Sequence, residues 1–573
     1  MKTRRLPFLL AITALPISLL VLSYPAVAGN ISFRKIYDVK QKPPGVNLVV
    51  DQFIGMPGGN ENAPSYDGRY VVFPLAVGGV APFSSHLWSF DTVAGRMIRM
   101  VGDNELYPGT DGVLRSYFVG GGFAPFTVDA GRLVFTGRAL TTTGEIYGFL
   151  SKPASSPNPA TVLVDTTKAV PDALGFTGNF HRFTFSTDVP IAQDNGVLVF
   201  NQDKSVGDGG SYKVPNTGGV INEIADDILM GTVFAPECCE ASDYNTNRLV
   251  ADTGNVFGTG PIVTIKDDRT ELQTIVSSER GDKVPNDPEN RVFDIFRLQA
   301  PQIESRNVVF QGAAIPHVAG STRDLAGLYS FVYNAALPRT PATPDGLPPY
   351  APGRLVRLVD SNMAVPGGTG KFTRDDPFEG TLAGGGFSFS GNNVFFLGKD
   401  QAGKQGLYHV LITGGKITKI VANGDTLPDG RIVGGANGSL SDQPPIQIDS
   451  AHNNEIVVKL TVKTATPGSA AFDAVYAFGS QGLPVVPVLC NGIKATIIGT
   501  PGNDVINGTA GRDIIAGLGG NDTINGLGGN DVICGDDGID ILDGGVNTDI
   551  LVGGNGNDTC RNGETNVTCE ILQ

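Results

Sequence analysis

The 573-residue sequence is poor in charged, aromatic and sulfur-bearing side chains. Asp, Glu, Lys and Arg make up 17% of it, and it has one tryptophan, five histidines and six cysteines. Its hydrophobic content is still 41%, which disfavours a disordered chain. The charge that is present is acidic, with a formal net value of −15. This balance argues against nucleic acid, or an anionic membrane surface, as a partner.

Long apolar runs are also missing, apart from one at the N-terminus. A short basic stretch precedes an apolar segment from Leu6 to Leu22, and Ala26-Val27-Ala28 follows. This order is typical of a secretory signal peptide, so we expect residues 1–28 to be removed before Gly29 and the chain to be exported. An uncleaved membrane anchor is the alternative, which the well-formed Ala-Val-Ala site disfavours. No second stretch is apolar enough to span a bilayer, so we expect no membrane span in the mature chain.

Motifs of common catalytic and metal centres are missing as well. We find no H-E-x-x-H, no G-x-S-x-G and no paired C-x-x-C. Around Gly370-Lys371 a P-loop pattern fails, because Val365 and Phe372 stand at two required positions. Asp375 and Asp376 are adjacent carboxylates that could bind a cation or act as an acid–base pair. We interpret them as part of a solvated turn, which is the commoner case. The histidines lack ligand spacing, and we interpret them as surface or satisfied core residues: His86, His181, His317, His409 and His452.

Glycine and proline are abundant, at 77 and 38 residues, which favours an all-β chain with many turns. From Gly29 to Leu489 a polar turn followed by a hydrophobic strand recurs seven times. The copies are Gly68–Phe73, Gly131–Phe135, Gly196–Phe200, Arg248–Val250 (the weakest), Asn307–Phe310, Asn393–Phe396 and Asn454–Val458. Most are followed by a strand with an aromatic residue: Trp88, Tyr147, Tyr212, Tyr329, Tyr408 and Tyr476. Loops built on proline separate the copies, as at Val365-Pro366-Gly367.

Seven similar strand units separated by turns predict a seven-bladed β-propeller over residues 29–489. This part of the chain weakly resembles secreted bacterial β-propellers. Arg34–Tyr37 and Val46–Val50 are expected to supply outer strands to the last blade and so close the ring. An array of β-sandwiches is the alternative fold.

The segment from Gly499 to Cys560 repeats every nine residues, as in GLGGNDTIN and GLGGNDVIC. The eighth position of each unit is aliphatic until Cys560, and the sixth is always aspartate. These aspartates are Asp504, Asp513, Asp522, Asp531, Asp540, Asp549 and Asp558. Three residues of each unit suffice for a very short strand whose middle side chain alone points inward. The other six form a turn, in which glycine permits positive φ.

This repeat resembles the hemolysin-type (RTX-like) calcium-binding nonapeptide, G-G-x-G-x-D-x-U-x. The resemblance implies a right-handed parallel β-roll in which two units complete one coil and the aspartates stack in two rows. Stacked carboxylates about 5 Å apart repel one another, and Ca²⁺ removes that repulsion by binding carboxylate and carbonyl oxygens. The seven aspartates are therefore the predicted metal ligands. A glycine-rich linker that does not fold is the alternative.

Six cysteines in an exported chain suggest three disulfides, although fifteen pairings are possible. A Cys560–Cys569 bridge would cap the roll, and a Cys490–Cys534 bridge would tie its entry to the fourth unit. The adjacent Cys238 and Cys239 would then form a strained bridge or remain free thiols. We expect residues 490–573 to be the roll with its cysteine-bearing cap.

These patterns predict an exported, calcium-binding, all-β protein. Its leading predicted role is binding or surface interaction with an extracellular ligand, a glycan or a protein. The alternative is a secreted propeller hydrolase or lyase whose catalytic groups lie near the propeller axis, where sequence motifs do not reveal them.

Overall fold

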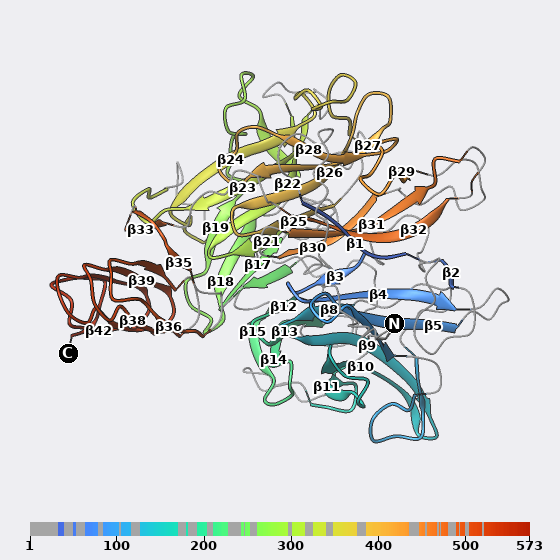
Figure 1. The fold of residues 1–573 in the computed structure, drawn as a ribbon, viewed down its shortest axis with the longest axis horizontal. Coiled ribbons are helices and arrows are strands. Elements are labelled where there is room, and N and C mark those ends of the chain that lie inside the picture. The colour runs from blue at the N-terminus through green and yellow to red at the C-terminus, as the bar shows by residue number, and fades with distance from the viewer. Residues whose placement is uncertain are drawn as a thin grey trace, which may run out of the picture.

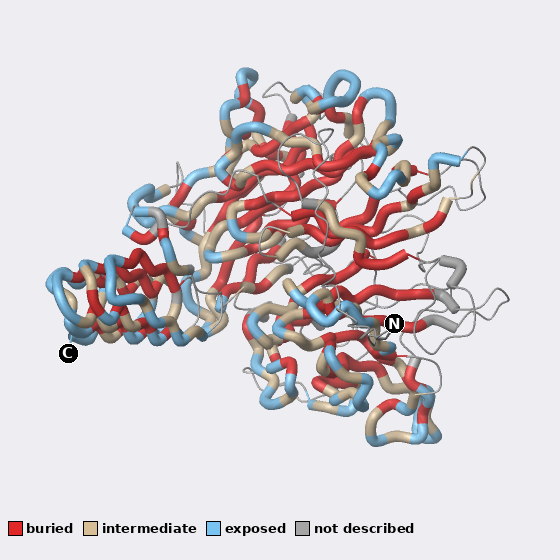
Figure 2. The backbone as a smooth tube through the Cα atoms, in the orientation of Figure 1, coloured by how far each residue is buried: buried red, intermediate tan, exposed pale blue. Residues whose placement is uncertain are grey.

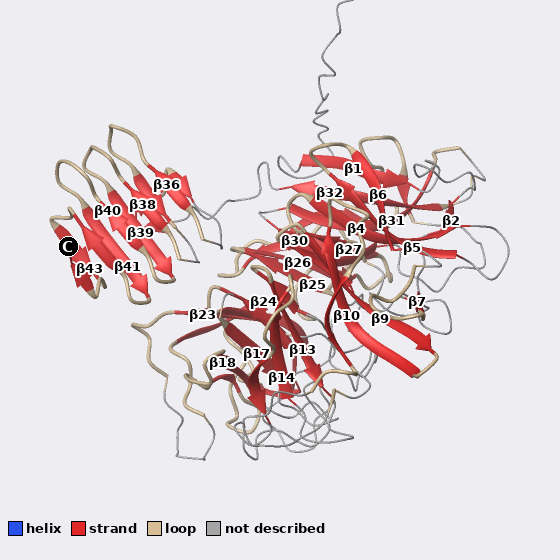
Figure 3. Ribbon diagram, turned by 90° about the horizontal axis from the view of Figure 1, so that it is seen from below, coloured by secondary structure: helices blue, strands red, loops and turns tan. Residues whose placement is uncertain are grey.

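The computed structural model consists of β-strands and the segments that connect them, within the residues that it describes (Figure 1). Figure 3 shows the same strands coloured by secondary structure. The described residues are 32–38, 50–52, 63–77, 84–101, 105–115, 126–169, 179–180, 192–202, 210–226, 242–245, 247–252, 261–295, 301–315, 325–339, 348–374, 386–434, 446–452, 455–466, 469, 471–479, 489–491, 493–498, 503–517 and 521–572.

Seven antiparallel sheets follow one another along the chain, and four main strands form each. Blade 1 contains β3 (Ser65–Tyr66), β4 (Tyr70–Val77), β5 (Ser84–Asp91) and β6 (Arg96–Val101). Blade 2 contains β8 (Phe126–Asp129), β9 (Arg132–Thr141), β10 (Gly144–Pro153) and β11 (Thr161–Asp165). Blade 3 contains β12 (Ala192–Asp194), β13 (Val197–Gln202), β14 (Gly210–Pro215) and β15 (Asn222–Asp226). Blade 4 contains β16 (Ser242–Asn245), β17 (Arg248–Asp252), β18 (Ile262–Lys266) and β19 (Gln273–Val276).

The remaining three blades repeat this pattern. Blade 5 contains β21 (Gln302–Glu304), β22 (Asn307–Ile315), β23 (Leu325–Tyr333) and β24 (Gly353–Asp360). Blade 6 contains β25 (Phe387–Ser390), β26 (Asn393–Lys399), β27 (Gln405–Leu411) and β28 (Thr418–Ala422). Blade 7 contains β30 (Ile446–His452), β31 (Glu455–Lys463), β32 (Phe472–Gly479) and, from the N-terminus, β1 (Ser32–Asp38).

The first strands of the seven sheets contact one another in a closed ring, in the order β3, β8, β12, β16, β21, β25, β30 and back to β3. The sheets therefore radiate from a common axis, and the predicted seven-bladed propeller is confirmed. All seven hydrophobic segments found in the sequence overlap the second strand of a blade. All six predicted aromatic residues lie on the third strand of their blades.

Of the two N-terminal segments expected to close the ring, Arg34–Tyr37 does so as part of β1. Strand β1 pairs antiparallel with β32, and Arg34 forms an ion pair of 3.1 Å with Glu455 on β31. The expectation for Val46–Val50 is wrong where the structure describes it. Val50 begins β2 (Val50–Gln52), which pairs with β4 in blade 1 rather than with the last blade. The inner edge of β4 is free for β2 because β3 covers only part of its length.

Short extra strands extend the inner edge in three further blades in the same way. They come from the connection that precedes each blade and pair with its second strand. These are β7 (Val113–Arg115) on β9, β20 (Val292–Ile295) on β22 and β29 (Ile432–Val433) on β31. Isolated antiparallel bridges close the proline loops of these connections, as between Thr426 and Ile432 around Pro428.

Hydrophobic cores lie between adjacent blades. Figure 2 shows that much of the length of the blade strands is buried. A group of three aromatic rings recurs in these cores. In blade 5, Phe293 from the preceding connection meets Tyr329 edge-on, with ring centroids 4.8 Å apart, and Phe310 stacks on the same tyrosine. The equivalent groups are Phe180, Phe200 and Tyr212, and Phe372, Phe396 and Tyr408. Each connection is thus packed back onto the blade that follows it.

Polar links also join neighbouring blades at the turns beside the inner strands. The Gly131 amide donates to Asp67 of the preceding blade at 2.9 Å, and the Gly391 amide donates to Glu304 at 2.6 Å. Burial raises the pKa of Glu304 to about 7, with a further contribution from the charge of Asp243. The carboxyl group of Glu304 therefore lies in surroundings that disfavour its charged form.

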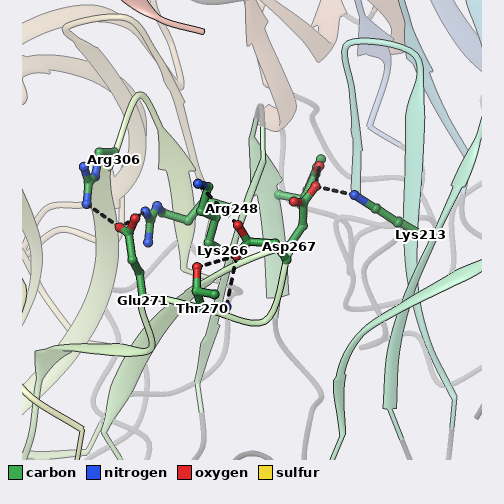
Figure 4. A network of polar contacts seen from close by, with 9 residues as sticks. Lys213, Arg248, Lys266, Asp267, Thr270, Glu271 and Arg306 are labelled. Carbon is green, nitrogen blue, oxygen red and sulfur yellow. Dashed lines mark hydrogen bonds and ion pairs between the residues drawn. The ribbon is translucent and has the colours of Figure 1, made fainter. Parts of the chain in front are cut away.

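Ion pairs tie blades 3, 4 and 5 together at the turn that follows β18 (Figure 4). Asp267 on this turn pairs with Lys213 of blade 3. Glu271 accepts from Arg248 of its own blade at 2.7 Å and from Arg306 of blade 5 at 3.1 Å. One turn of blade 4 therefore contacts the blade on either side.

The C-terminal repeats form two parallel sheets, which face each other as a roll (Figures 1 and 3). One sheet contains β35 (Ile497–Ile498), β37 (Ile514–Ala516), β39 (Val532–Asp537), β41 (Ile550–Asn555) and β43 (Thr565–Val567). The other contains β36 (Val505–Asn507), β38 (Thr523–Asn525), β40 (Ile541–Asp543), β42 (Thr559–Arg561) and β44 (Ile571–Leu572). Paired strands lie two units apart, as predicted, and the linker alternative is excluded.

The interior of the roll is a single file of eighth-position side chains from the two sheets. Its buried members are Ile515, Ile524, Ile533, Leu542, Leu551 and Cys560. This file has one side chain per unit, as expected, but further residues of the first sheet are buried as well. Ile514 and Val532 point away from the interior of the roll, and they pack in a second hydrophobic cluster that includes Cys490. Cys490 belongs to a hairpin formed by β33 (Leu489–Cys490) and β34 (Ile493–Lys494).

Both predicted roll disulfides are present. Cys490 is bonded to Cys534, which fastens the hairpin to the outside of the roll. Cys560 is bonded to Cys569 near the C-terminal end. Cys238 and Cys239 lie outside the described residues, so their pairing stays open.

Candidate metal centre

The sixth-position aspartates form two hydrogen-bonded rows, one along each edge of the roll. In all but the first aspartate of each row, Oδ1 accepts a hydrogen bond from the backbone N–H of the aspartate 18 residues earlier, at 2.8 or 2.9 Å. One row runs through Asp504, Asp522, Asp540 and Asp558, and the other through Asp513, Asp531 and Asp549. These bonds align the carboxylates along each row, because the donating aspartate amides lie next to paired strands of the parallel sheets.

The second carboxylate oxygen, Oδ2, has no hydrogen-bond partner in four of these aspartates: Asp522, Asp531, Asp549 and Asp558. At most 1% of each of these residues is exposed. Burying an ionised oxygen without a donor or a cation is strongly unfavourable. The rows therefore present anionic oxygens that the protein itself leaves unsatisfied.

Backbone carbonyl oxygens lie beside these Oδ2 atoms, next to the first glycine of each unit. A methyl group added to Gly526 would lie 2.5 Å from Asp531 Oδ2 and 2.7 Å from the carbonyl oxygen of Gly544. At Gly508 the corresponding distances are 2.9 Å to Asp513 Oδ2 and 2.7 Å to the Gly526 carbonyl. Any side chain here would fill the space that the two oxygens share, so glycine keeps it open.

The electrostatics of the rows disfavour ionisation when no cation is bound. Burial, together with the neighbouring charges of Asp540 and Asp504, raises the pKa of Asp522 to about 7. Burial likewise raises the pKa of Asp531 and Asp549. A divalent cation beside such carboxylates would reverse this preference, because it stabilises their charged form.

The residues present therefore fit calcium. Ca²⁺ takes six to eight oxygen ligands from carboxylates and backbone carbonyls in flexible geometry, and both kinds of oxygen line the two edges. Among the described residues, no three His, Cys, Asp or Glu side chains come together as a metal cluster. A site here would combine the carboxylate oxygens with the backbone carbonyls that lie beside them. Bound calcium would supply positive charge between successive coils.

The structure places all seven predicted aspartates in the two predicted rows, but sequence reasoning missed two carboxylates at the end. Glu564 Oε2 accepts from the Asp549 amide at 2.5 Å, and Glu570 Oε2 accepts from the Asp558 amide at 2.9 Å. These bonds span 15 and 12 residues instead of 18. The nine-residue period therefore gave no signal for them.

The other candidate residues that the structure describes form no comparable centre. His409 is buried, and burial lowers its pKa to about 4, as fits a core residue. Its Nε2 is hydrogen-bonded to Asn393 Oδ1 at 2.8 Å, whereas its Nδ1 has no hydrogen-bond partner. His181, His317 and the pair Asp375 and Asp376 lie outside the described residues. Within the described part of the chain, no helix has the length and apolar character needed to cross a membrane.

Comparison with solved structures gives only remote similarities. The β-propeller domain of the Trilobed protease from Pyrococcus furiosus is 8% identical, with 77% of this chain and 99% of that chain covered and a TM-score of 0.36. Polysaccharide lyase Uly1 is 10% identical, with 77% and 94% covered and a TM-score of 0.36. An oligogalacturonate lyase in complex with manganese is 12% identical, with 78% and 96% covered and a TM-score of 0.34.

No curated protein matches the chain. The model of the RTX calcium-binding nonapeptide repeat matches residues 498–533 and 528–560. This segment contains the seven stacked aspartates and the glycines that keep the space beside them open. Residues 498–560 are therefore RTX calcium-binding nonapeptide repeats, and they follow a seven-bladed β-propeller.

Proposed function

We propose that this chain is an exported protein whose roll is ordered by calcium outside the cell and whose propeller is a rigid binding or surface-interaction module. Its ligand is an extracellular glycan or protein. The proposal includes cleavage after Ala28, a propeller over residues 29–489 and a roll with its cap over residues 490–573.

The observation that carries the proposal is the pair of rows of buried, unpartnered carboxylate oxygens beside backbone carbonyls. Without cations the rows oppose folding of the roll, because buried like charges face one another within each row. With calcium the same oxygens become ligands, so folding and metal binding are linked. Extracellular calcium modules work at roughly 10⁻⁴ to 10⁻³ M, which supports a site that fills after export.

The propeller suits a binding role because of where its connections leave the blades. Strands within a blade alternate in direction, so all connections from an outer strand to the next inner strand leave at one end of the axis. Several are long, such as those from Asp165 to Ala192 and from Asp360 to Phe387. Loops that a rigid scaffold holds together are the usual position of binding residues.

The test uses the full mature chain with calcium and with a chelator. Calorimetry should detect calcium binding, and hydrogen exchange should show the roll protected only when calcium is present. The chain should then bind a component of a glycan array or a cell-surface protein panel without turning over common ester, glycoside or polysaccharide substrates. Absence of calcium binding would contradict the proposal. Turnover abolished by replacing one carboxylate near the propeller axis would make the protein an enzyme instead.

A further inference from the structure

The C-terminal cap, residues 561–572, continues both carboxylate rows beyond the segment that matches the repeat family. In the repeats, each aspartate amide donates to the aspartate of the next coil. At the end of the rows, the amides of Asp549 and Asp558 donate to Glu564 and Glu570 instead. The backbone follows the same course, since Thr565 and Ile571 donate to the carbonyls of these two aspartates. The cap thus replaces a further coil with a shorter stretch of chain.

The cap also continues the arrangement of carbonyl oxygens. A methyl group added to Gly544 would lie 2.7 Å from Asp549 Oδ2 and would also contact the carbonyl oxygen of Asn562. At Gly553 it would lie 2.6 Å from Asp558 Oδ2 and contact the Thr568 carbonyl. In the repeats, the first glycine of the next coil supplies this carbonyl.

Two further observations indicate that these oxygens are positioned for a ligand. Asp549 and Asp558 are fully buried, and the Oδ2 atom of each has no hydrogen-bond partner. Thr568 has a φ of +53°, a conformation that is costly for a β-branched residue. Its backbone is held there by the neighbouring Cys560–Cys569 disulfide and by a 2.8 Å bond from the Gly554 amide to its hydroxyl.

We propose that the cap forms two further calcium sites, one at each edge of the roll. One combines Asp549 Oδ2 with the Asn562 carbonyl, and the other combines Asp558 Oδ2 with the Thr568 carbonyl. Glu564 and Glu570 supply the negative charge that an aspartate of the next coil supplies elsewhere. The inference rests on the proposed calcium-dependent ordering of the roll, and it extends the metal sites to residues that the repeat pattern does not include.

The test is the number of calcium ions bound per full mature chain, measured by equilibrium dialysis and atomic absorption. The double variant Glu564→Gln/Glu570→Gln keeps an acceptor for both amides but removes the two charges. It should bind two fewer ions than the wild type at the same free calcium concentration, and each single variant one fewer. The control is Asp543→Asn, which removes a roll carboxylate outside both rows, where it pairs with Arg561. Asp543 Oδ1 also accepts from Asn562 Nδ2 at 2.8 Å, and an asparagine oxygen can keep that bond. The control should leave the number unchanged.

Mass spectrometry of the Cys560–Cys569 peptide shows whether the cap has formed in each variant. If the double variant lacks this disulfide, the two single variants decide. Equal calcium binding by a variant with an intact cap and by the wild type would overturn the inference, because hydrogen bonding alone would then explain the glutamates. That result would leave calcium binding by the repeats intact, whereas a wild type that binds no calcium would contradict both proposals.

Discussion

Replacement of Asp522 by asparagine should stabilise the roll without calcium and destabilise it with calcium. The wild-type Oδ1 accepts from the Asp504 amide at 2.8 Å, and an asparagine oxygen can keep that bond. The amide nitrogen would then take the place of Oδ2, beside the carbonyl oxygen of Gly535. It would replace an unsatisfied anion with a hydrogen-bond donor, but it would not bind calcium.

The size of the effect without calcium follows from the cost of the buried charge. Burial and neighbouring carboxylates raise the pKa of Asp522 from 3.8 to about 7. At about 1.4 kcal/mol per tenfold change, the ionised form would cost the folded roll about 4 kcal/mol without screening. Solvent screens charge at the edge of a roll only two sheets deep, so we expect a stabilisation of about 1–2 kcal/mol. With saturating calcium, loss of one ligand should weaken binding at least about tenfold, or about 1.4 kcal/mol.

Hydrogen exchange of roll peptides in the full chain measures both effects, with and without calcium. Asp543→Asn is the matched control, because it removes a charge from the same roll outside the two rows. It should shift protection little in either condition. Equal destabilisation of the Asp522→Asn variant with and without calcium would refute the reasoning, since the carboxylate would then be needed only for packing or hydrogen bonding.

Three further outcomes are expected. Leu542→Ala should destabilise the calcium-loaded roll by about 2–4 kcal/mol, because Leu542 is fully buried. Ile541→Ala, at a neighbouring residue that is 41% exposed, should cost under about 1 kcal/mol. Equal costs of the two substitutions in calorimetry would contradict the single-file core. Glu304 has a raised pKa of about 7, so the folded propeller holds this proton more tightly than the unfolded chain does, and the stability it contributes at acidic pH is lost as pH rises through 7. Glu304→Gln should therefore lose less thermal stability between pH 5 and pH 8 than the wild type; parallel melting curves would oppose this. Exported protein should begin at Gly29 by N-terminal sequencing, and material that begins at Met1 would contradict the predicted cleavage.

Sequence patterns predicted the repeated elements of this chain because each copy has the same burial and therefore needs the same type of residues. A second strand such as Asn393–Phe396 is buried on both faces, so it appears as a continuous hydrophobic run. The first strands escaped notice because they are short, as in Ser65–Tyr66. The blade that Val50 joins depends on which strand has an unpaired edge in the folded ring, and here that strand is β4. A local sequence pattern does not carry this information.

Prediction of the metal rows succeeded for similar reasons and ended where the period ends. The seven aspartates recur at fixed spacing, so their stacking follows from the nine-residue unit. Glu564 and Glu570 reach the same rows through a shorter chain path, which only the folded cap reveals. Burial of Ile514 and Val532 likewise depends on a hairpin that docks from outside the repeats.

The strand that completes the last blade lies ahead of all seven blades' other described strands in the sequence. Strand β1 ends at Asp38, but its partner β32 begins at Phe472, and Arg34 meets Glu455 across 421 residues. A growing chain therefore carries an unpaired edge strand until nearly the whole propeller has been made, and closing so long a loop is slow. The ring cannot be completed one blade at a time from its beginning. A chain truncated before β32 would keep two open edges, on which another copy could pair, so the final stretch of the propeller decides whether each molecule closes on itself.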